Sequence, residues 1–307
     1  MSTHVVGVIL IFTGVMGGCL WWFLRNDMRI APRPLLGLFA FVVYLAIVFG
    51  AILGSLVLPI GRDTIQRWWG HGLFLVMLGL GAVFLVLFTR YVGWWRPVMR
   101  EEPRTAPRWT MAVTALYLVA GLAVAARPGV PTLGALQTFW LGFYSVLFGF
   151  SFVILYQGLL LVAFRASMPE VGVWFLTSLM FAFLGMIFAF ILGGQTFLGY
   201  AETIGVWFLL GTSLYVVRMA QGSLVPAMLV CVLWDFALRT GSVVATDRVI
   251  RRPDWSVDGL SPVEGLTFWL MLIVTVVAAW RIILAKNAAT AAKPLPLQRT
   301  SFKLLGP

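Results

Sequence analysis

Long apolar runs alternate with short polar segments along the whole chain. A membrane-spanning helix needs about 20 apolar residues, and the pattern therefore predicts an all-α, polytopic membrane protein with about nine transmembrane helices. The count ranges from eight to ten because the fifth run is too long for one upright helix, so that it is tilted, kinked near Gly149, or preceded by an interfacial turn at 132–137. The runs cover about residues 4–24, 35–60, 72–89, 109–126, 133–163, 171–192, 198–217, 223–238 and 265–285.

The apolar runs divide the chain into five parts. Residues 1–131 contain the first spans, about four by length, and residues 132–240 form a helical core. A long polar loop follows at 241–264, and the last transmembrane helix is expected at 265–287. The remaining residues, 288–307, are basic and contain prolines, so we expect a flexible tail held near the lipid surface.

The composition agrees with a location in the membrane. Apolar residues make up 61% of the chain and charged residues 11%, and the mean hydropathy is +0.97. Such a chain has little aqueous surface, and its expected surroundings are the lipid bilayer. The net charge of +11 does not indicate a nucleic-acid partner, because the arginines and lysines lie between and after the apolar runs rather than on one soluble face.

The distribution of basic residues predicts the orientation. Cytoplasmic loops carry an excess of Lys and Arg, and fifteen of the 22 basic residues fall in one set of alternate loops. The N-terminus is therefore expected outside and the C-terminus in the cytoplasm, with a bacterial plasma membrane as the location. At the ends of spans, Arg165, Arg218 and Arg281 are interpreted as snorkelling to the lipid surface, and the pair Glu101 and Glu102 as solvated.

Ionisable residues within the apolar runs are few. A charge at the centre of a span costs roughly 2.5 to 3.5 kcal/mol, so each one needs a reason. Asp235 lies in the eighth run, four residues after Cys231, and on a helix the two share one face. They are either a buried thiol and a carboxylate bonded to a neighbouring helix, or the remains of a metal or catalytic site. Glu202 lies near the start of the seventh run.

Several kinds of site are excluded by the residues present. The two histidines, His4 and His71, form no HExxH pair, and the sequence contains no GxSG motif and no pair of in-membrane aspartates. The phosphate-binding pattern GxxxxGK(S/T) is also absent from the sequence. Two cysteines, Cys19 and Cys231, cannot build a disulfide framework or a multi-cysteine metal site.

The segment 223–236, SLVPAMLVCVLWDF, resembles the last motif of the CPBP intramembrane metalloproteases, the family of CAAX proteases and bacteriocin-processing (Abi) proteins. That motif has a histidine followed four residues later by Asn or Asp. Here Cys231 takes the position of the histidine, and Asp235 keeps the last position. The second motif, FxxxH, corresponds to Phe181 and Gly185, so that glycine replaces its histidine.

The first motif of the family, EExxxR, corresponds to FVILYQ in this chain. Phe152 and Val153 stand in place of the two glutamates, and Gln157 stands in place of the arginine. In active members the glutamates and histidines position a metal or water and cleave a peptide beside the membrane. All four are replaced here, so the resemblance implies that residues 132–240 are a CPBP-like core of a degenerate member with no metal or other cofactor.

Three functions remain open. The first is a non-catalytic pseudoprotease that binds a membrane-protein partner or a lipidated peptide in the former active-site cavity, with Gln157, Cys231 and Asp235 as its polar remnant. The second is an active metalloprotease that holds zinc through displaced residues such as Cys231, Asp235 and Glu202. The third is a structural or transport-associated subunit of a membrane complex, for which small residues such as Gly79 allow close helix contact.

Overall fold

The computed structural model of the chain describes six segments, and helices make up nearly all of them. Expectations that lie outside these segments are those for the first apolar run, for Cys19, His4, His71 and Glu102, for most of the loop 241–264 and for most of the tail. The two ends of that predicted loop are helical instead, since α11 (Leu224–Thr246) and α12 (Pro262–Ala291) extend into it. The side chain of Glu202 is also outside the described part. The described segments are residues 31–57, 73–101, 105–125, 134–192, 197–246 and 262–291.

The described segments consist mainly of successive helices. The π-helical segment η3 joins α7 to α8 without a break, and one isolated β-bridge pairs Arg100 with Ser223. The described residues contain no strand, so the predicted all-α class is confirmed. The bounds are α2 Pro34–Val57, α4 Leu73–Tyr91, α5 Trp95–Met99, η1 Arg108–Thr110, α6 Met111–Ala125, α7 Ala135–Val153, η3 Ile154–Leu160, α8 Leu161–Arg165, α9 Glu170–Leu192, α10 Phe197–Gln221, α11 Leu224–Thr246 and α12 Pro262–Ala291.

Proline and glycine mark several of the helix ends. Pro34 and Pro262 are the first residues of α2 and α12. A proline at this position costs no hydrogen bond, because the first backbone N–H of a helix has no partner within the helix. Gly93 follows α4 with φ 76° and Gly222 follows α10 with φ 67°, a left-handed conformation that glycine adopts without strain. The amide of Gly222 donates to the carbonyl of Arg218 at 2.8 Å, which satisfies one of the last carbonyls of α10.

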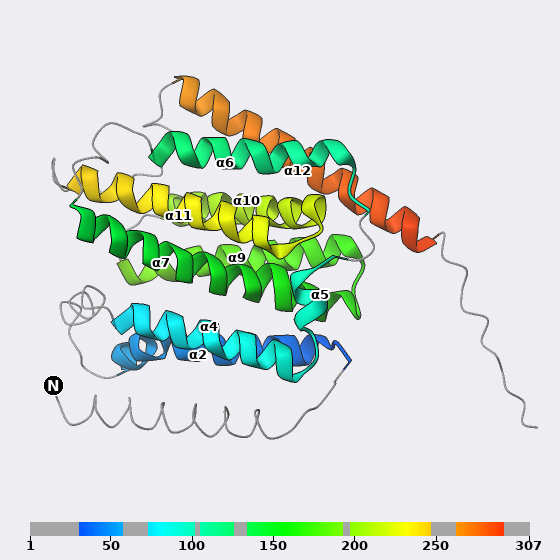
Figure 1. The fold of residues 1–307 in the computed structure, drawn as a ribbon, viewed down its shortest axis with the longest axis horizontal. Coiled ribbons are helices and arrows are strands. Elements are labelled where there is room, and N and C mark those ends of the chain that lie inside the picture. The colour runs from blue at the N-terminus through cyan, green and yellow to red at the C-terminus, as the bar shows by residue number, and fades with distance from the viewer. Residues whose placement is uncertain are drawn as a thin grey trace, which may run out of the picture.

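The long helices lie side by side in one bundle (Figure 1). On one side α2 packs against α4, in the middle α10 packs against α9 and α11 against α7, and on the other side lie α6 and α12. Large apolar side chains face outward, and on α7 these are Leu136, Phe139, Trp140, Phe143 and Val146. Several polar side chains of the same bundle are buried, among them Ser145, Ser151, Gln157, Thr177 and Ser178. This inside-out distribution suits a molecule whose surroundings are apolar.

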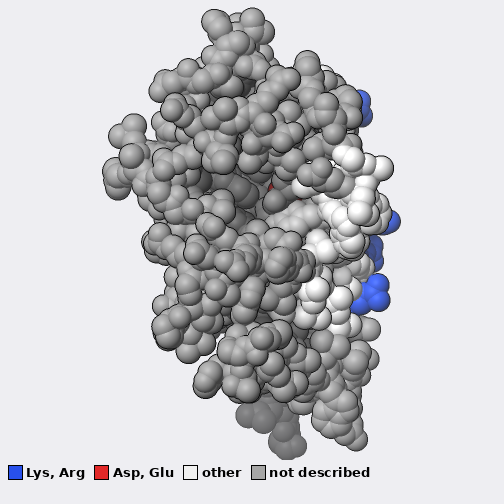
Figure 2. Space-filling model, turned by 90° about the vertical axis from the view of Figure 1, so that its left-hand side faces the viewer, with Lys and Arg blue, Asp and Glu red and all other residues white. Residues whose placement is uncertain are grey.

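Three helical stretches of the described chain are long and apolar enough to cross a membrane, namely Thr138–Arg165, Ile204–Gln221 and Leu270–Ala289. Apolar stretches in α2, α4, α9 and α11 are shorter within the described residues. On the face shown in Figure 2, the described basic side chains lie along one edge, beside uncharged ones. The apolar residues of the chain are thus concentrated in helices, three of which are long enough within the described residues to cross a membrane.

The fifth apolar run forms one continuous helical rod from α7 through η3 to α8. Its irregular part is the π-helical segment at 154–160, where an extra residue is accommodated within the helix. Gly149 lies in regular α-helix, and α11 approaches it closely: a Cβ atom at Gly149 would lie 2.5 Å from Cγ2 of Val232 and 3.0 Å from its amide nitrogen. The glycine therefore serves helix packing.

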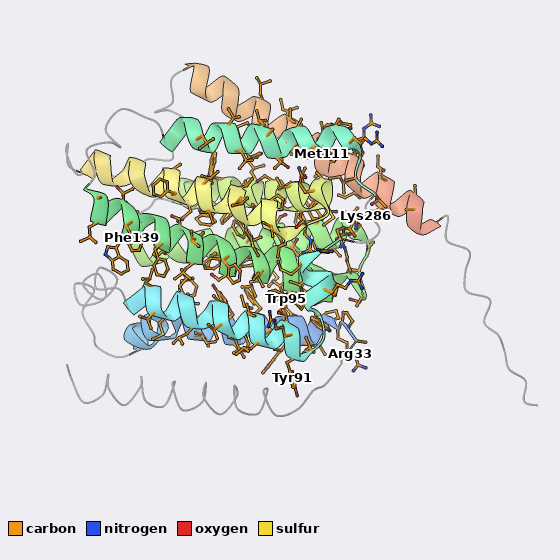
Figure 3. All side chains as sticks on the ribbon, in the orientation of Figure 1. Arg33, Tyr91, Trp95, Met111, Phe139 and Lys286 are labelled. Atoms are coloured by element: carbon orange, nitrogen blue, oxygen red, sulfur yellow. The ribbon has the colours of Figure 1, made fainter. Side chains whose placement is uncertain are left out.

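Connections that are far apart in the sequence meet at one end of the bundle. The amide of Glu101, which follows α5, donates to the carbonyl of Gly222, which follows α10. Lys286 of α12 contacts Glu101, and Arg165 at the end of α8 contacts Glu170 at the start of α9. Figure 3 shows Trp95 and Lys286 toward this end and Phe139 toward the other. These are loops that the positive-charge pattern assigns to one side.

Candidate functional site

The residues whose pattern resembles the protease motifs lie on three packed parts of the bundle. Phe152 and Val153 end α7, and Gln157 lies in η3. Phe181 and Gly185 lie on α9, and Cys231 and Asp235 lie on α11. All seven are buried, and Asp235 has the largest exposure of those measured, at 8%.

Aromatic side chains fill the space between the first two of these motifs. We call Tyr44, Phe148, Phe152, Tyr156, Phe181 and Trp207 the aromatic cluster. Phe152 stacks on Tyr156 with ring centroids 6.2 Å apart, and Tyr156 meets the edge of Phe181 at 5.2 Å. Phe181 packs against Trp207 at 5.5 Å. The motif positions Phe152 and Phe181 are therefore brought together, through Tyr156, in a packed apolar core.

Gly185, which stands where the family has a histidine, is covered by the indole ring of Trp207. A Cβ atom built on Gly185 would overlap three ring atoms of Trp207. No side chain fits there unless the indole moves. Trp207 of α10 thus occupies the volume that a metal-binding imidazole on α9 would need.

Gln157 is completely buried and bonds to the neighbouring helix. Its Nε2 donates to the carbonyl of Gly211 in α10 at 2.9 Å. Its Oε1 has no hydrogen-bond donor among the described residues. Of the two ends of the Gln157 amide, only Nε2 can donate to a carbonyl. The bond to Gly211 therefore fixes the orientation of the amide.

Asp235 bonds to α7 rather than to Gln157. The hydroxyl of Ser145 donates to Oδ2 of Asp235 at 2.8 Å, and Cys231 lies one turn earlier on α11, 1% exposed. Positions 145 and 157 of the helical rod are about 18 Å apart along its axis at 1.5 Å per residue. Asp235 and Gln157 therefore lie on contacting elements but at different depths. The described residues contain no group of three or more His, Cys, Asp or Glu that could hold a metal ion.

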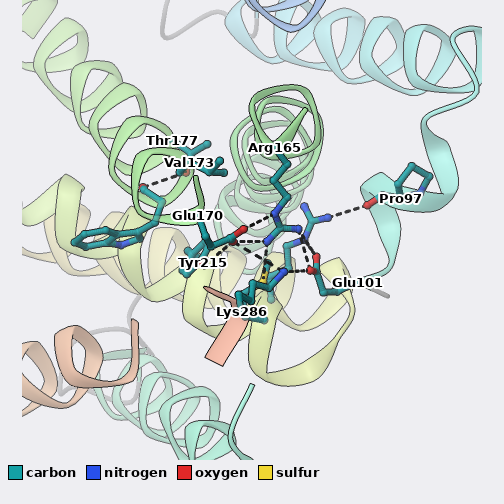
Figure 4. Close-up of polar contacts among 11 residues, drawn as sticks. Pro97, Glu101, Arg165, Glu170, Val173, Thr177, Tyr215 and Lys286 are labelled. Carbon is teal, nitrogen blue, oxygen red and sulfur yellow. Dashed lines mark hydrogen bonds and ion pairs between the residues drawn. The ribbon is translucent and has the colours of Figure 1, made fainter. Parts of the chain in front are cut away.

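A second group of polar residues, which the sequence did not identify as a site, gathers at the loop end of the bundle. We call Glu101, Arg165, Glu170, Tyr215, Arg218 and Lys286 the ionic cluster (Figure 4). The prediction that Glu101 is solvated is wrong, since 8% of the residue is exposed. The prediction that Arg218 snorkels to the surface is also wrong, because Arg218 is fully buried.

Arg165 links the two carboxylates of the ionic cluster. Its NH1 donates to both oxygens of Glu101, at 2.6 and 2.9 Å, and its Nε and NH2 donate to Glu170 at 3.0 and 2.5 Å. The hydroxyl of Tyr215 donates to Glu170 at 2.7 Å, and Lys286 donates to Glu101. Charge-assisted bonds of this kind are strong, so α8, α9, α10 and α12 are tied together at this end.

The cations of the cluster hold Glu101 in its charged form. Burial alone would raise the pKa of Glu101, but the charges of Arg165, Lys286 and Arg218 and the bond from Lys286 outweigh burial and lower the pKa from 4.5 to about 2. Glu101 is therefore ionised throughout the physiological pH range. A pattern of single charges in separate loops could not have revealed this arrangement.

Comparison of the chain with protein-family models, with curated proteins and with solved structures finds no match.

Proposed function

We propose that this protein is a non-catalytic, CPBP-like integral membrane protein that binds a membrane partner. It has about nine transmembrane helices by apolar-run length, with its N-terminus outside and its C-terminus in the cytoplasm of a bacterial cell. The three helical stretches of spanning length and the outward-facing apolar side chains support the membrane location. The order and spacing of the motif frame residues support the kinship.

One observation carries the non-catalytic part of the proposal. The motif positions of α7 and α9 meet in the aromatic cluster, and Trp207 covers Gly185. Hydrolysis requires an activated water beside the scissile bond. Buried aromatic rings leave neither the polar ligands nor the room for it. With Phe152, Val153, Gly185 and Cys231 at the positions of the two glutamates and two histidines, the core also avoids four buried polar groups that would need partners.

Because the aromatic cluster fills the space between α7 and α9, we expect the partner to bind on the opposite face of α7. A groove of about 600 Å³ lies there, between α4 and α7. Gly79 is one of the lining residues, and a Cβ atom at this position would meet nothing within 4 Å. An apolar helix of a membrane partner, or the lipid of a lipidated peptide, fits such a groove. Its lining residues are Leu75, Val76, Gly79, Ala82, Val83, Val86, Leu87, Phe143, Leu147 and Phe150.

Metal analysis and a protease assay test the absence of catalysis. We expect the purified protein to hold no stoichiometric zinc and to cleave neither prenylated nor unmodified peptides, with or without added metal. About one zinc per chain that is lost in Cys231→Ala would contradict the proposal, and so would cleavage that a chelator abolishes.

Photocrosslinking in native membranes tests the binding of a partner. A photoreactive residue in place of Gly79 should give a defined protein or lipopeptide adduct, which forms again when the captured component is purified and added back. The control position is Val277, which is 47% exposed on α12. Adducts with bulk lipid alone at both positions would contradict a partner in the groove. An obligate subunit role predicts, in addition, that the chain never purifies alone.

A further inference from the structure

Arg218 is the one cation of the ionic cluster whose hydrogen bonds are largely unmade among the described residues. Its NH2 donates to the carbonyl of Pro97 at 2.9 Å. Its Nε and NH1 have no acceptor within hydrogen-bonding distance in the described part of the chain, and Oε2 of Glu101 lies 3.9 Å from Nε. A guanidinium carries five N–H donors, so Nε and NH1 leave three of them without a described partner.

The carboxylates of the cluster are already engaged by other groups. Glu101 accepts from Arg165 and Lys286, and Glu170 accepts from Arg165 and Tyr215. Neither carboxylate comes within hydrogen-bonding distance of Nε or NH1 of Arg218, although Glu101 remains an ion-pair neighbour of Nε. A fully buried guanidinium needs acceptors for its N–H groups, because burial removes the water that would accept from them, and the described residues supply none for Nε and NH1.

The charges of the cluster do not balance. Arg165, Arg218 and Lys286 carry three positive charges, and Glu101 and Glu170 carry two negative ones, which leaves one positive charge. An anion of charge −1 would neutralise the cluster. A phosphate monoanion has this charge and several oxygens that can accept from a guanidinium fork.

We propose that the ionic cluster binds a phosphate group, whose oxygens accept from Nε and NH1 of Arg218. Arg165 and Lys286, with side chains 22% and 14% exposed, form the outer edge through which the group enters. The ligand is the phosphodiester of a phospholipid or free inorganic phosphate. The excess of basic residues on this side of the chain favours negatively charged groups there.

Thermal unfolding of the full chain in an uncharged detergent tests the site. Inorganic phosphate should raise the melting temperature relative to chloride at equal ionic strength, because a ligand that binds the folded state stabilises it. Arg218→Gln should raise the half-saturating phosphate concentration roughly tenfold or more, as expected when charge-assisted bonds are lost. Arg281→Gln is the matched control: it removes the same charge from an exposed side chain of α12 and should leave the response unchanged.

Phosphorus analysis distinguishes the two sources. If the ligand is a lipid, thoroughly washed wild-type protein keeps about one phosphorus per chain and Arg218→Gln does not; if it is free phosphate, the washed protein holds none and responds only in the titration. Should Arg218→Gln fail to fold, Arg218→Lys keeps the charge without the fork and should still weaken the response. An equal response of wild-type protein and both Arg218 variants would overturn the proposal, as would neither response nor retained phosphorus in the wild-type protein.

Discussion

The missing side chain of Gly185 determines how closely α9 and α10 can pack. A Cβ atom there would overlap the Trp207 ring, whereas one on Gly205, in α10, would meet nothing within 4 Å. We predict that Gly185→Ala lowers the free energy of unfolding by about 1–3 kcal/mol through overpacking. Gly205→Ala should leave it unchanged or raise it by up to about 1 kcal/mol. Denaturant unfolding in detergent measures both, and equal effects would show that Trp207 does not close this position.

The hydroxyl of Ser145 on α7 donates a hydrogen bond to the buried Asp235 on α11. Ser145→Ala should lower the free energy of unfolding by about 1–3 kcal/mol, because it leaves a carboxylate oxygen without that donor. Thr177→Val is the matched control, since the hydroxyl of Thr177 bonds carbonyls of its own helix, at 2.8 and 3.2 Å. If Ser145→Ala costs no more than the control, the bond between α7 and α11 is not a stabilising contact.

Individual residues differ in how far their surroundings could be predicted. Asp235 could be recognised as a buried carboxylate with a partner on a neighbouring helix, because it is alone in an apolar run and exposure to lipid would be costly. Its partner Ser145 could not be named. The burial of Glu101 could not be predicted either, since its three cations come from helices far away in the sequence.

Between elements, the contact of α7 with α11 depends on Gly149. The nearest atoms to a Cβ at this position include the amide of Val232 at 3.0 Å and the carbonyl of Met228 at 3.3 Å. Backbone atoms cannot turn aside as a side chain can, so Gly149→Ala should separate the two helices and cost about 1–3 kcal/mol. Gly142→Ala is the control on the same helix, because its closest neighbour, Phe236, lies 3.9 Å away. Unfolding measurements that rank Gly142→Ala as the more harmful change would contradict this packing.

The described long helices correspond to apolar runs recognised in the sequence. Length and hydropathy suffice for this, because a helix in an apolar medium must be apolar along its whole length. The extension of α11 to Thr246 goes beyond its run, since apolar runs mark the lipid-compatible part and not the helix end. The π-helical turn in η3 could not be predicted from the sequence. Every residue of η3 is buried, so its apolar and polar positions show no helical period that an extra residue would interrupt.

For the whole molecule, the ionic cluster joins several segments that are far apart in the sequence. It connects the residue after α5 to the ends of α8 and α10, the start of α9 and the last part of α12. The sequence showed basic loops on one side but not which of their charges pair. Pairing depends on how the helices are arranged around one another, and that arrangement is not encoded in any single segment.

Acid should therefore weaken the assembly at this end before the apolar core is affected. The pKa of Glu101 lies at about 2 in the folded protein and at about 4.5 when the chain is unfolded, so its contribution is complete above pH 4.5 and is lost as the pH falls toward 2. Integrated over that range it amounts to roughly 3 kcal/mol. Glu101→Gln should be less stable than the wild-type protein at pH 7, and its stability should vary less between pH 4.5 and 2. Unfolding curves at constant ionic strength measure both, and parallel pH profiles of the two proteins would mean that other carboxylates, and not Glu101, respond to acid.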